Sequence, residues 1–242
     1  MKHFKFEPQF RRWCKTSNTS EAGLTLVEGL VAILVVSAVT ISITPAIFLA
    51  VATRVQNRRA EQAIQLAHGQ IDQVRVLIEQ GIQPDTVDRL PAQADGSDLS
   101  AVAAPSSAFG SLQSTNFECS NYDRNPSQVP VDSALPVDID GDCEEDFFVQ
   151  TFRGNEQTIE IDTEDSTSEI PIVFGMGVRV YYRNAEFGNL ETQEASLTLT
   201  NGQGQQTRRP LAVLYTTLAQ ADRSQALQKY CEMLPGGSNC DF

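Results

Sequence analysis

The sequence predicts an α+β protein in which one long N-terminal helix packs on an antiparallel β-sheet head. Two observations carry this prediction. An apolar run and then apolar residues at three-to-four spacing fill positions 24–80, and strand-like runs fill positions 146–219. Between them, residues 81–145 are rich in Ser, Ala, Gly, Pro and Asp, and we expect a variable loop region with an acidic loop.

The first half of the helix, residues 24–52, is predicted to span a membrane. It carries one charged side chain, Glu28, and it is long enough to cross a bilayer. A carboxylate in hydrocarbon costs about 2.5 kcal/mol or more, so Glu28 needs a partner and indicates a function. Pro45 is expected to kink the helix. Three arginines that follow the run are expected to mark the far membrane interface: Arg54, Arg58 and Arg59.

The second half, residues 53–80, is predicted to be amphipathic. Apolar positions recur every three or four residues: Ala60, Ala63/Ile64, Ala67, Ile71, Val74 and Leu77/Ile78. Gly81 and then Pro84 fit a helix stop. One helix from Leu24 to Gln80 would have 57 residues and a length of about 85 Å. We expect its apolar stripe to pack against the sheet.

The residues around the start of the apolar run carry a family resemblance. Residues 1–23 contain five Lys or Arg and two Glu, which predicts a basic cytoplasmic leader. The run then opens with Gly23-Leu24-Thr25-Leu26-Val27-Glu28. A secretory signal peptide places its cleavage site after the apolar core, whereas this glycine lies before it. The N-terminus resembles that of type IV prepilins and pseudopilins. An uncleaved membrane anchor with a chance motif is the other interpretation.

The resemblance implies a pilin fold and a route of assembly. A prepilin peptidase would cut between Gly23 and Leu24, removing the leader, and Leu24 would be N-methylated. Glu28 would pair with the N-terminal amine of the same or a neighbouring subunit, while Thr25 and Pro45 would act in helix packing. The implied partners are other pilin subunits, the peptidase and an inner-membrane assembly platform. The chain would be single-pass in the inner membrane and later part of a surface pilus or a periplasm-spanning filament.

The expected function is structural. A head of this size favours a minor pilin with a role in pilus assembly, adhesion, motility or DNA uptake. A pseudopilin of a type II-like secretion system is one alternative, and a membrane-tethered calcium- or glycan-binding module is another. No catalytic residues are predicted, because the histidines are His3 in the leader and His68 on the helix.

The charge of the chain argues against nucleic acid as a direct partner. The net charge is −13, and removing the leader's +3 leaves −16 for the mature chain. Binding to phosphates requires clustered Lys and Arg, which the head does not have.

Four cysteines remain once Cys14 leaves with the leader, and in an oxidising compartment an even number predicts disulfides. Three pairings are possible, and the local ones, Cys119–Cys143 and Cys231–Cys240, are favoured. Residues 220–242 would then form a C-terminal disulfide loop, similar to that of many type IV pilins. Zinc is disfavoured because no CxxC pair is present.

The acidic loop is a candidate calcium site. Aspartates alternate along the segment 138–146, and calcium binds six to eight oxygen ligands. The candidate ligands are Asp138, Asp140, Asp142 and Asp146. The spacing resembles the calcium loops of integrin-type repeats, except that Cys143 stands where those loops have glycine. A solvated acidic loop without metal is the other interpretation.

The head is predicted to contain four or five strands. The strand-like runs are Phe147–Phe152, Thr158–Asp162, Ile170–Tyr182, Ala195–Thr200 and Leu211–Thr217. Alternation around Arg179 predicts a half-buried strand, and Asn201-Gly202-Gln203-Gly204 is a predicted turn. Arg179, Tyr181 and Tyr182 are candidates for binding a sugar or a partner, although ordinary strand positions are the simpler explanation.

Overall fold

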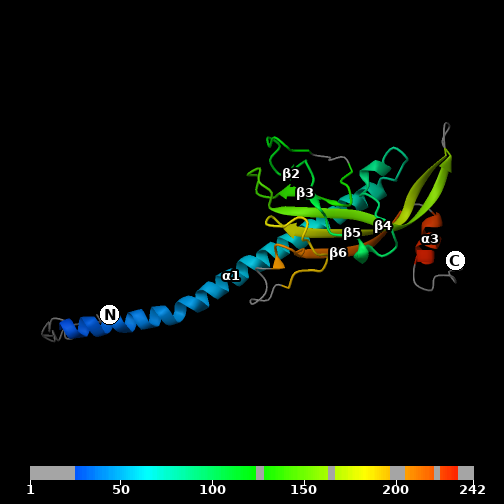
Figure 1. Ribbon diagram of the computed structural model, residues 1–242. Coiled ribbons are helices and arrows are strands. Elements are labelled where there is room, and N and C mark those ends of the chain that lie inside the picture. Colours follow the sequence, from blue (N-terminus) through cyan, green and yellow to red (C-terminus); the bar gives the residue numbers. More distant parts are fainter. Residues whose placement is uncertain (1–24, 124–127, 163–166, 197–204, 221–223, 234–242) are drawn as a thin grey trace, which may run out of the picture. The chain divides into compact units, whose positions relative to one another are not determined.

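The computed structural model of the chain describes residues 25–123, 128–162, 167–196, 205–220 and 224–233 (Figure 1). The chain divides into two compact units, residues 1–48 and 49–242. Helix α1, Leu26–Glu79, forms the described part of the first unit and continues into the second. One long helix is therefore present as predicted, and its expected first residue, Leu24, lies outside the described residues.

Both ends of α1 follow from local sequence signals. At the start, the backbone N–H of Glu28 donates to the Thr25 hydroxyl at 3.3 Å, and the N–H of Gly29 donates to the Thr25 carbonyl at 3.1 Å. Thr25 is thus the N-cap of a Thr-x-x-Glu sequence. At the end, Gly81 adopts a left-handed φ of +86°, and its N–H donates to the Ile78 carbonyl.

The second unit holds a mixed sheet with the strand order β1-β3-β4-β5-β6, and β2 also pairs with β3. Its strands are β1 (Ser107–Ala108), β2 (Gln113–Ser114), β3 (Ser133–Asp138), β4 (Phe147–Asp162), β5 (Thr167–Tyr182) and β6 (Ala212–Ala219). The last four pair antiparallel, whereas β1 and β2 run parallel to β3. The prediction of a wholly antiparallel sheet is wrong at this edge, where the chain returns in the same direction through a long connection.

The strand boundaries differ from the prediction in three places. Strand β3 lies in the region expected to be a variable loop, and Pro136 within it conceals the strand pattern. The two runs expected within residues 147–162 form one strand, β4, with an irregular register after Gly154. Ala195 and Ser196 are not in a strand, and the rest of that expected strand and the Asn201–Gly204 turn lie outside the described residues.

The core lies between the sheet and the second half of α1. The helix buries a stripe of small and aliphatic side chains: Ala60, Ala63, Ala67, Ile71, Val74 and Ile78. They pack with the apolar residues of β4, β5 and β6 that point to the same side, among them Phe174 and Val178. The predicted apolar stripe is confirmed. The alanines of this stripe are nearly inaccessible to solvent, so this side of the helix is covered.

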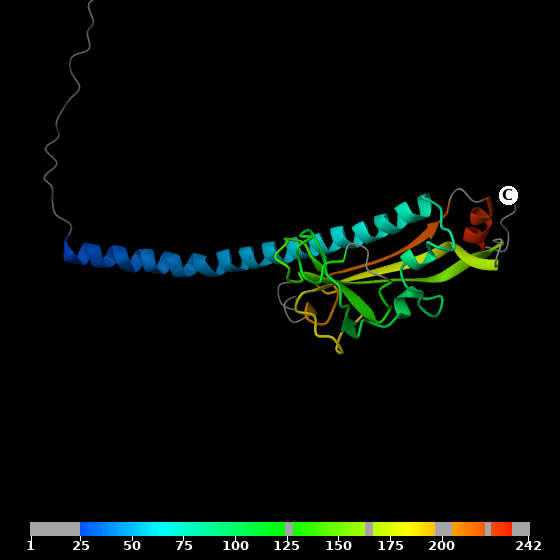
Figure 2. The same cartoon turned by 90° about the horizontal axis from the view of Figure 1, so that it is seen from above.

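The opposite face of the sheet is also covered (Figure 2). Leu99 and Val102 pack with Phe152, and Phe187 and Leu190 pack with Phe148 and Tyr181. The segment before β1 and the segment after β5 therefore close this face. The prediction of a half-buried strand is wrong for this reason, because β5 buries residues on both of its faces.

Two short 3₁₀ turns and one further helix complete the described fold. The turns are η1 (Val87–Arg89) and η2 (Leu99–Ala101). Helix α3, Ser224–Met233, was not predicted and lies in the region expected to be only a disulfide loop. Its Ala226 joins the core, with Ile159 and Ile161 of β4 packed against the same cluster. The segment is amphipathic, so its pattern could have identified the helix.

Candidate functional site

The first half of α1 exposes apolar side chains around its whole circumference. Large hydrophobic residues from Leu26, at 85% exposure, to Phe48, at 77%, are accessible along the first unit. Among the described residues this is the one helix long and apolar enough to cross a membrane by length and composition. An all-apolar helix surface requires burial in lipid or against other helices. This half of α1 is therefore the first candidate site, and it could serve as a membrane anchor.

Three hydroxyl groups of this helical segment bond to the helix itself. The hydroxyl groups of Thr40, Ser42 and Thr44 donate to the carbonyl oxygens four residues earlier, at 2.6–2.8 Å. Such bonds suit an apolar environment because they give these three hydroxyl groups an acceptor without water. The helix continues through Pro45. The segment is thus chemically adapted to an environment without water.

Glu28 lies exposed in the first turn of α1. Its backbone N–H is bound by Thr25, as described above, which gives this pair a local role in starting the helix that the sequence interpretation did not assign. The carboxylate also suits the positive end of the helix dipole. An assembly role for Glu28 stays a prediction. The expected cleavage and methylation residues, Gly23 and Leu24, lie outside the described residues.

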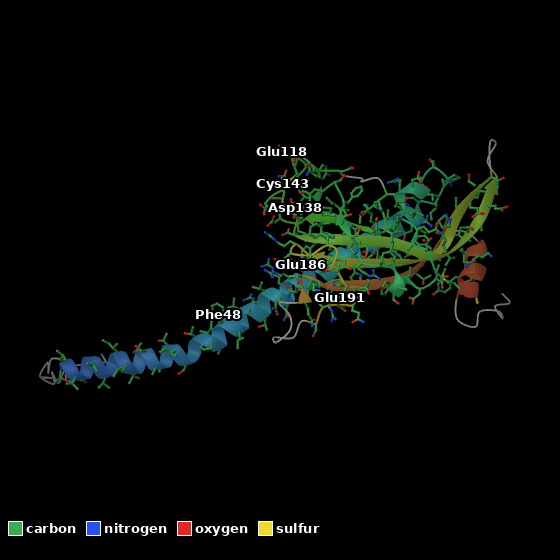
Figure 3. The ribbon with its side chains drawn as sticks, in the orientation of Figure 1. Phe48, Glu118, Asp138, Cys143, Glu186 and Glu191 are labelled. Atoms are coloured by element: carbon green, nitrogen blue, oxygen red, sulfur yellow. A yellow bond between two sulfur atoms is a disulfide. The ribbon has the colours of Figure 1, made fainter. Side chains whose placement is uncertain are left out.

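Asp138 anchors the second candidate site, the acidic loop formed by residues 138–146 (Figure 3). Its carboxylate is almost fully buried, at 1% exposure, at the end of β3. It accepts hydrogen bonds from the Ser114 hydroxyl at 2.7 Å, from the Gly141 N–H at 2.7 Å and from the Cys143 N–H at 2.9 Å. Parallel pairing of β2 with β3 places Ser114 beside it. Burial alone would raise the pKa of Asp138, but these hydrogen bonds hold it below its usual value.

Three of the four candidate calcium ligands lie close together. Carboxylate oxygens of Asp138, Asp140 and Asp146 are within 4.8 Å of one another, and Asp142 is not in this group. The N–H of Asp142 lowers the pKa of Asp140, but slight burial and the surrounding carboxylates outweigh it and raise that pKa. Asp146 accepts from the Ile139 N–H at 3.0 Å. Hydrogen bonds within the loop therefore occupy these groups, and calcium binding stays a prediction.

A disulfide joins Cys119 to Cys143 and ties the acidic loop to the segment after β2. Cys143 has a φ of +68°, a left-handed conformation that favours glycine. Cys143 thus holds a backbone conformation that a glycine would adopt with less strain. Cys231 is also disulfide-bonded, and its expected partner Cys240 lies outside the described residues.

Sequence reasoning missed a polar cluster on the far face of the sheet, which is the face turned away from α1. Arg179 is fully buried and stacks on Phe152, and its guanidinium donates to the carbonyl oxygens of Val102 at 2.7 Å and Ala103 at 3.2 Å. It also donates to the Tyr215 hydroxyl. Arg179 therefore cannot contact an external partner. The signal that could have identified it is its place among apolar neighbours on a strand.

The tyrosines beside it are engaged as well. Tyr181 is fully buried and donates to the Glu191 carbonyl at 3.0 Å, and burial raises the pKa of its hydroxyl. The ring of Tyr182 receives the guanidinium of Arg59 at 4.4 Å from its centre. The candidate binding role of Arg179 and Tyr181 is thus corrected, because both side chains are used to hold the head together.

The second unit also contains a cavity of about 630 Å³ between α1, the segment around η1 and the sheet. Its lining includes Gln70 and Gln73 of α1, Gln113 of β2 and Met176 of β5. Asp88 and Arg89 are its charged lining residues. This lining contains no paired carboxylates or histidine of the kind used in acid–base catalysis.

Comparison of the chain with protein-family models, with curated proteins and with solved structures found no match.

Proposed function

We propose that the chain is a structural subunit of a type IV pilus-like filament, most similar in role to a minor pilin. The single observation that carries the proposal is the contrast along α1. One helix is exposed and apolar all round in its first half and buries one stripe of its second half in the core of the head. The first half needs lipid before assembly and neighbouring helices after it.

The residues at the start of α1 give the proposal its chemistry. A peptidase would cut after Gly23, so that Leu24 becomes the N-terminal residue and Glu28 the fifth. In the filament, the Glu28 carboxylate pairs with the amine of a subunit's N-terminus. Removing one partner of a buried ion pair costs about 3–5 kcal/mol, and 1.4 kcal/mol already corresponds to a factor of ten in binding. Assembly would therefore depend strongly on this one side chain.

Mass spectrometry of the N-terminus tests the proposal directly. Sheared surface filaments and membranes are compared, and an N-methylated Leu24 is expected in the filaments. The same terminus in membranes alone would favour a pseudopilin of a secretion system. An intact Met1 in both fractions would contradict the proposal and leave a plain membrane anchor.

Substitution of Glu28 separates its charge from its place in the N-terminal turn. Glutamine is also compatible with the third position of a capping box, so Glu28→Gln keeps the start of the helix while it removes the charge. We expect at least about a tenfold loss of the subunit from filaments, with an unchanged membrane level. Glu79→Gln, at the other end of α1, is the matched control and should assemble normally. Normal incorporation of Glu28→Gln would contradict the proposed pairing.

A further inference from the structure

Arg54 and Arg58 are cations of α1 without a carboxylate partner among the described residues. The ion pairs found there join Arg75, Arg153, Arg183, Arg208 and Arg209 to acidic side chains. Arg59, next to Arg58, is engaged by the ring of Tyr182. Two unneutralised guanidinium groups therefore follow directly on the apolar half of the helix.

These two arginines point away from the head. They lie one helical turn apart and are both exposed. Gln56, which lies between them in the sequence, and Ala60, which follows them, are buried, at 7% and 6% exposure. Glu61 is exposed one turn further along, yet it forms no ion pair with Arg58 within the described structure. The side of α1 that the head leaves open thus presents the arginines to the surroundings.

The spacing of charges along α1 matches the thickness of a bilayer. No acidic or basic side chain lies between Glu28 and Arg54. The 26 residues from one to the other cover about 39 Å of helix, and a bilayer with its headgroup layers is about 40–45 Å thick. With Glu28 in one headgroup layer, Arg54 reaches the other, and Arg58 lies one turn beyond it. Both ends of the segment can then keep their charges out of the hydrocarbon.

We propose that Arg54 and Arg58 bind the phosphates of anionic phospholipids in the leaflet on the head side of the membrane. The inference rests on the proposed function only in taking α1 as a membrane-spanning helix. Guanidinium groups match phosphate geometry with paired hydrogen bonds. The arginines would also offset the repulsion between an anionic membrane surface and a chain of net charge −13.

Lipid selectivity of the full chain in vesicles tests this site. The protein is reconstituted in phosphatidylcholine with a trace of spin-labelled phosphatidylglycerol or spin-labelled phosphatidylcholine, and electron spin resonance measures how much of each label the protein immobilises. We expect the wild type to prefer phosphatidylglycerol. Each arginine should contribute up to about fivefold to this preference, and the double variant Arg54→Gln/Arg58→Gln should lose both contributions. The variant Arg54→Lys/Arg58→Lys should keep most of the preference, and Arg75→Gln, a control further along α1, should keep all of it.

The outcomes are separable from those of the proposed function. An unchanged preference in Arg54→Gln/Arg58→Gln would overturn the inference, as would an equal loss in Arg75→Gln. The five cations of residues 1–23 are present in every variant, so they cannot produce a difference between variants. N-terminal mass and filament content are measured on the same proteins. An intact Met1 would contradict processing while leaving the lipid preference of the anchor measurable.

Discussion

Gln150 and Arg179 face each other across β4 and β5, and both donate to the carbonyl oxygen of Ala103. Arg179 also donates to the Gln150 side chain at 3.3 Å. A cross-strand pair on the sheet thus holds the segment before β1 over its far face. Within the described part of the chain, the guanidinium bonds to backbone carbonyls, to Gln150 and to the Tyr215 hydroxyl, and to no carboxylate.

Replacement of Arg179 should therefore destabilise the head. Arg179→Met leaves several backbone carbonyls of residues 99–103 without their donor, and we expect the free energy of unfolding to fall by about 2–4 kcal/mol. Urea unfolding of the detergent-solubilised chain measures this. Arg179→Lys should lose nearly as much, because one ammonium cannot replace a planar fork of donors. If Arg179→Met and the wild type unfold with the same urea midpoint, the hydrogen bonds of Arg179 contribute no net stability.

Gly177 is expected to tolerate no side chain. A Cβ atom at this position would lie 2.4 Å from the ring of Phe152, which packs flat over the strand. Gly177→Ala should therefore lower the free energy of unfolding by about 1–3 kcal/mol. Gly110→Ala is the matched control, because nothing lies within 4 Å of its added Cβ. Combining Gly177→Ala with Phe152→Leu should recover part of the loss, and the absence of any recovery would contradict the proposed clash.

The buried carboxylate of Asp138 should make stability depend on pH. Its pKa is lower in the folded chain than the ordinary value of 3.8, so its stabilising contribution is complete above that value. The contribution is lost as the pH falls through the folded pKa. We expect the difference in unfolding free energy between the wild type and Asp138→Asn to be constant above about pH 5 and to shrink below about pH 4. A difference that is the same from pH 6 to pH 3 would contradict this.

The disulfide between Cys119 and Cys143 closes a loop with a sequence separation of 24. Its removal in Cys119→Ser/Cys143→Ser should cost about 3 kcal/mol of unfolding free energy. Cys143 has a left-handed backbone, so Cys119→Ser/Cys143→Gly should be more stable than the double serine variant by about 0.5–1 kcal/mol. The thermal unfolding midpoints of the two variants without the disulfide are compared. Equal midpoints would mean that the backbone conformation at position 143 carries no strain.

The elements that could be predicted from the sequence are those with long periodic patterns. The 54 residues of α1 and the 16 residues of β5 carry extended apolar patterns. Strand β3 escaped prediction because it is short and contains Pro136, and its parallel partners have two residues each. The parallel pairing is set by contacts distant in sequence, which a local pattern does not encode.

Sequence spacing could indicate groups that lie close in the chain, but not groups that only the fold brings together. Asp138, Asp140 and Asp146 of the acidic loop are near neighbours in the chain and lie close together, whereas Asp142 is outside that group, and calcium binding stays a prediction. The role of Ser114 as a donor to Asp138 depends on strand pairing, and the role of Arg179 depends on a segment some 80 residues earlier that covers the sheet. In each case a side chain that looked ordinary acquired its role from tertiary contacts.

The continuity of α1 bears on how its apolar half could leave the lipid bilayer and still remain helical. Starting a helix is costly, whereas extending one is nearly free. The buried second half of α1 acts as a permanent nucleus, anchored by Ala63, Ala67 and Ile71 under the sheet. The exposed half can therefore propagate from it and need not nucleate again when it leaves lipid. Propagation is weakest at Pro45, which lacks the N–H that would continue the ladder, so the apolar half has one defined place at which the helix can be interrupted.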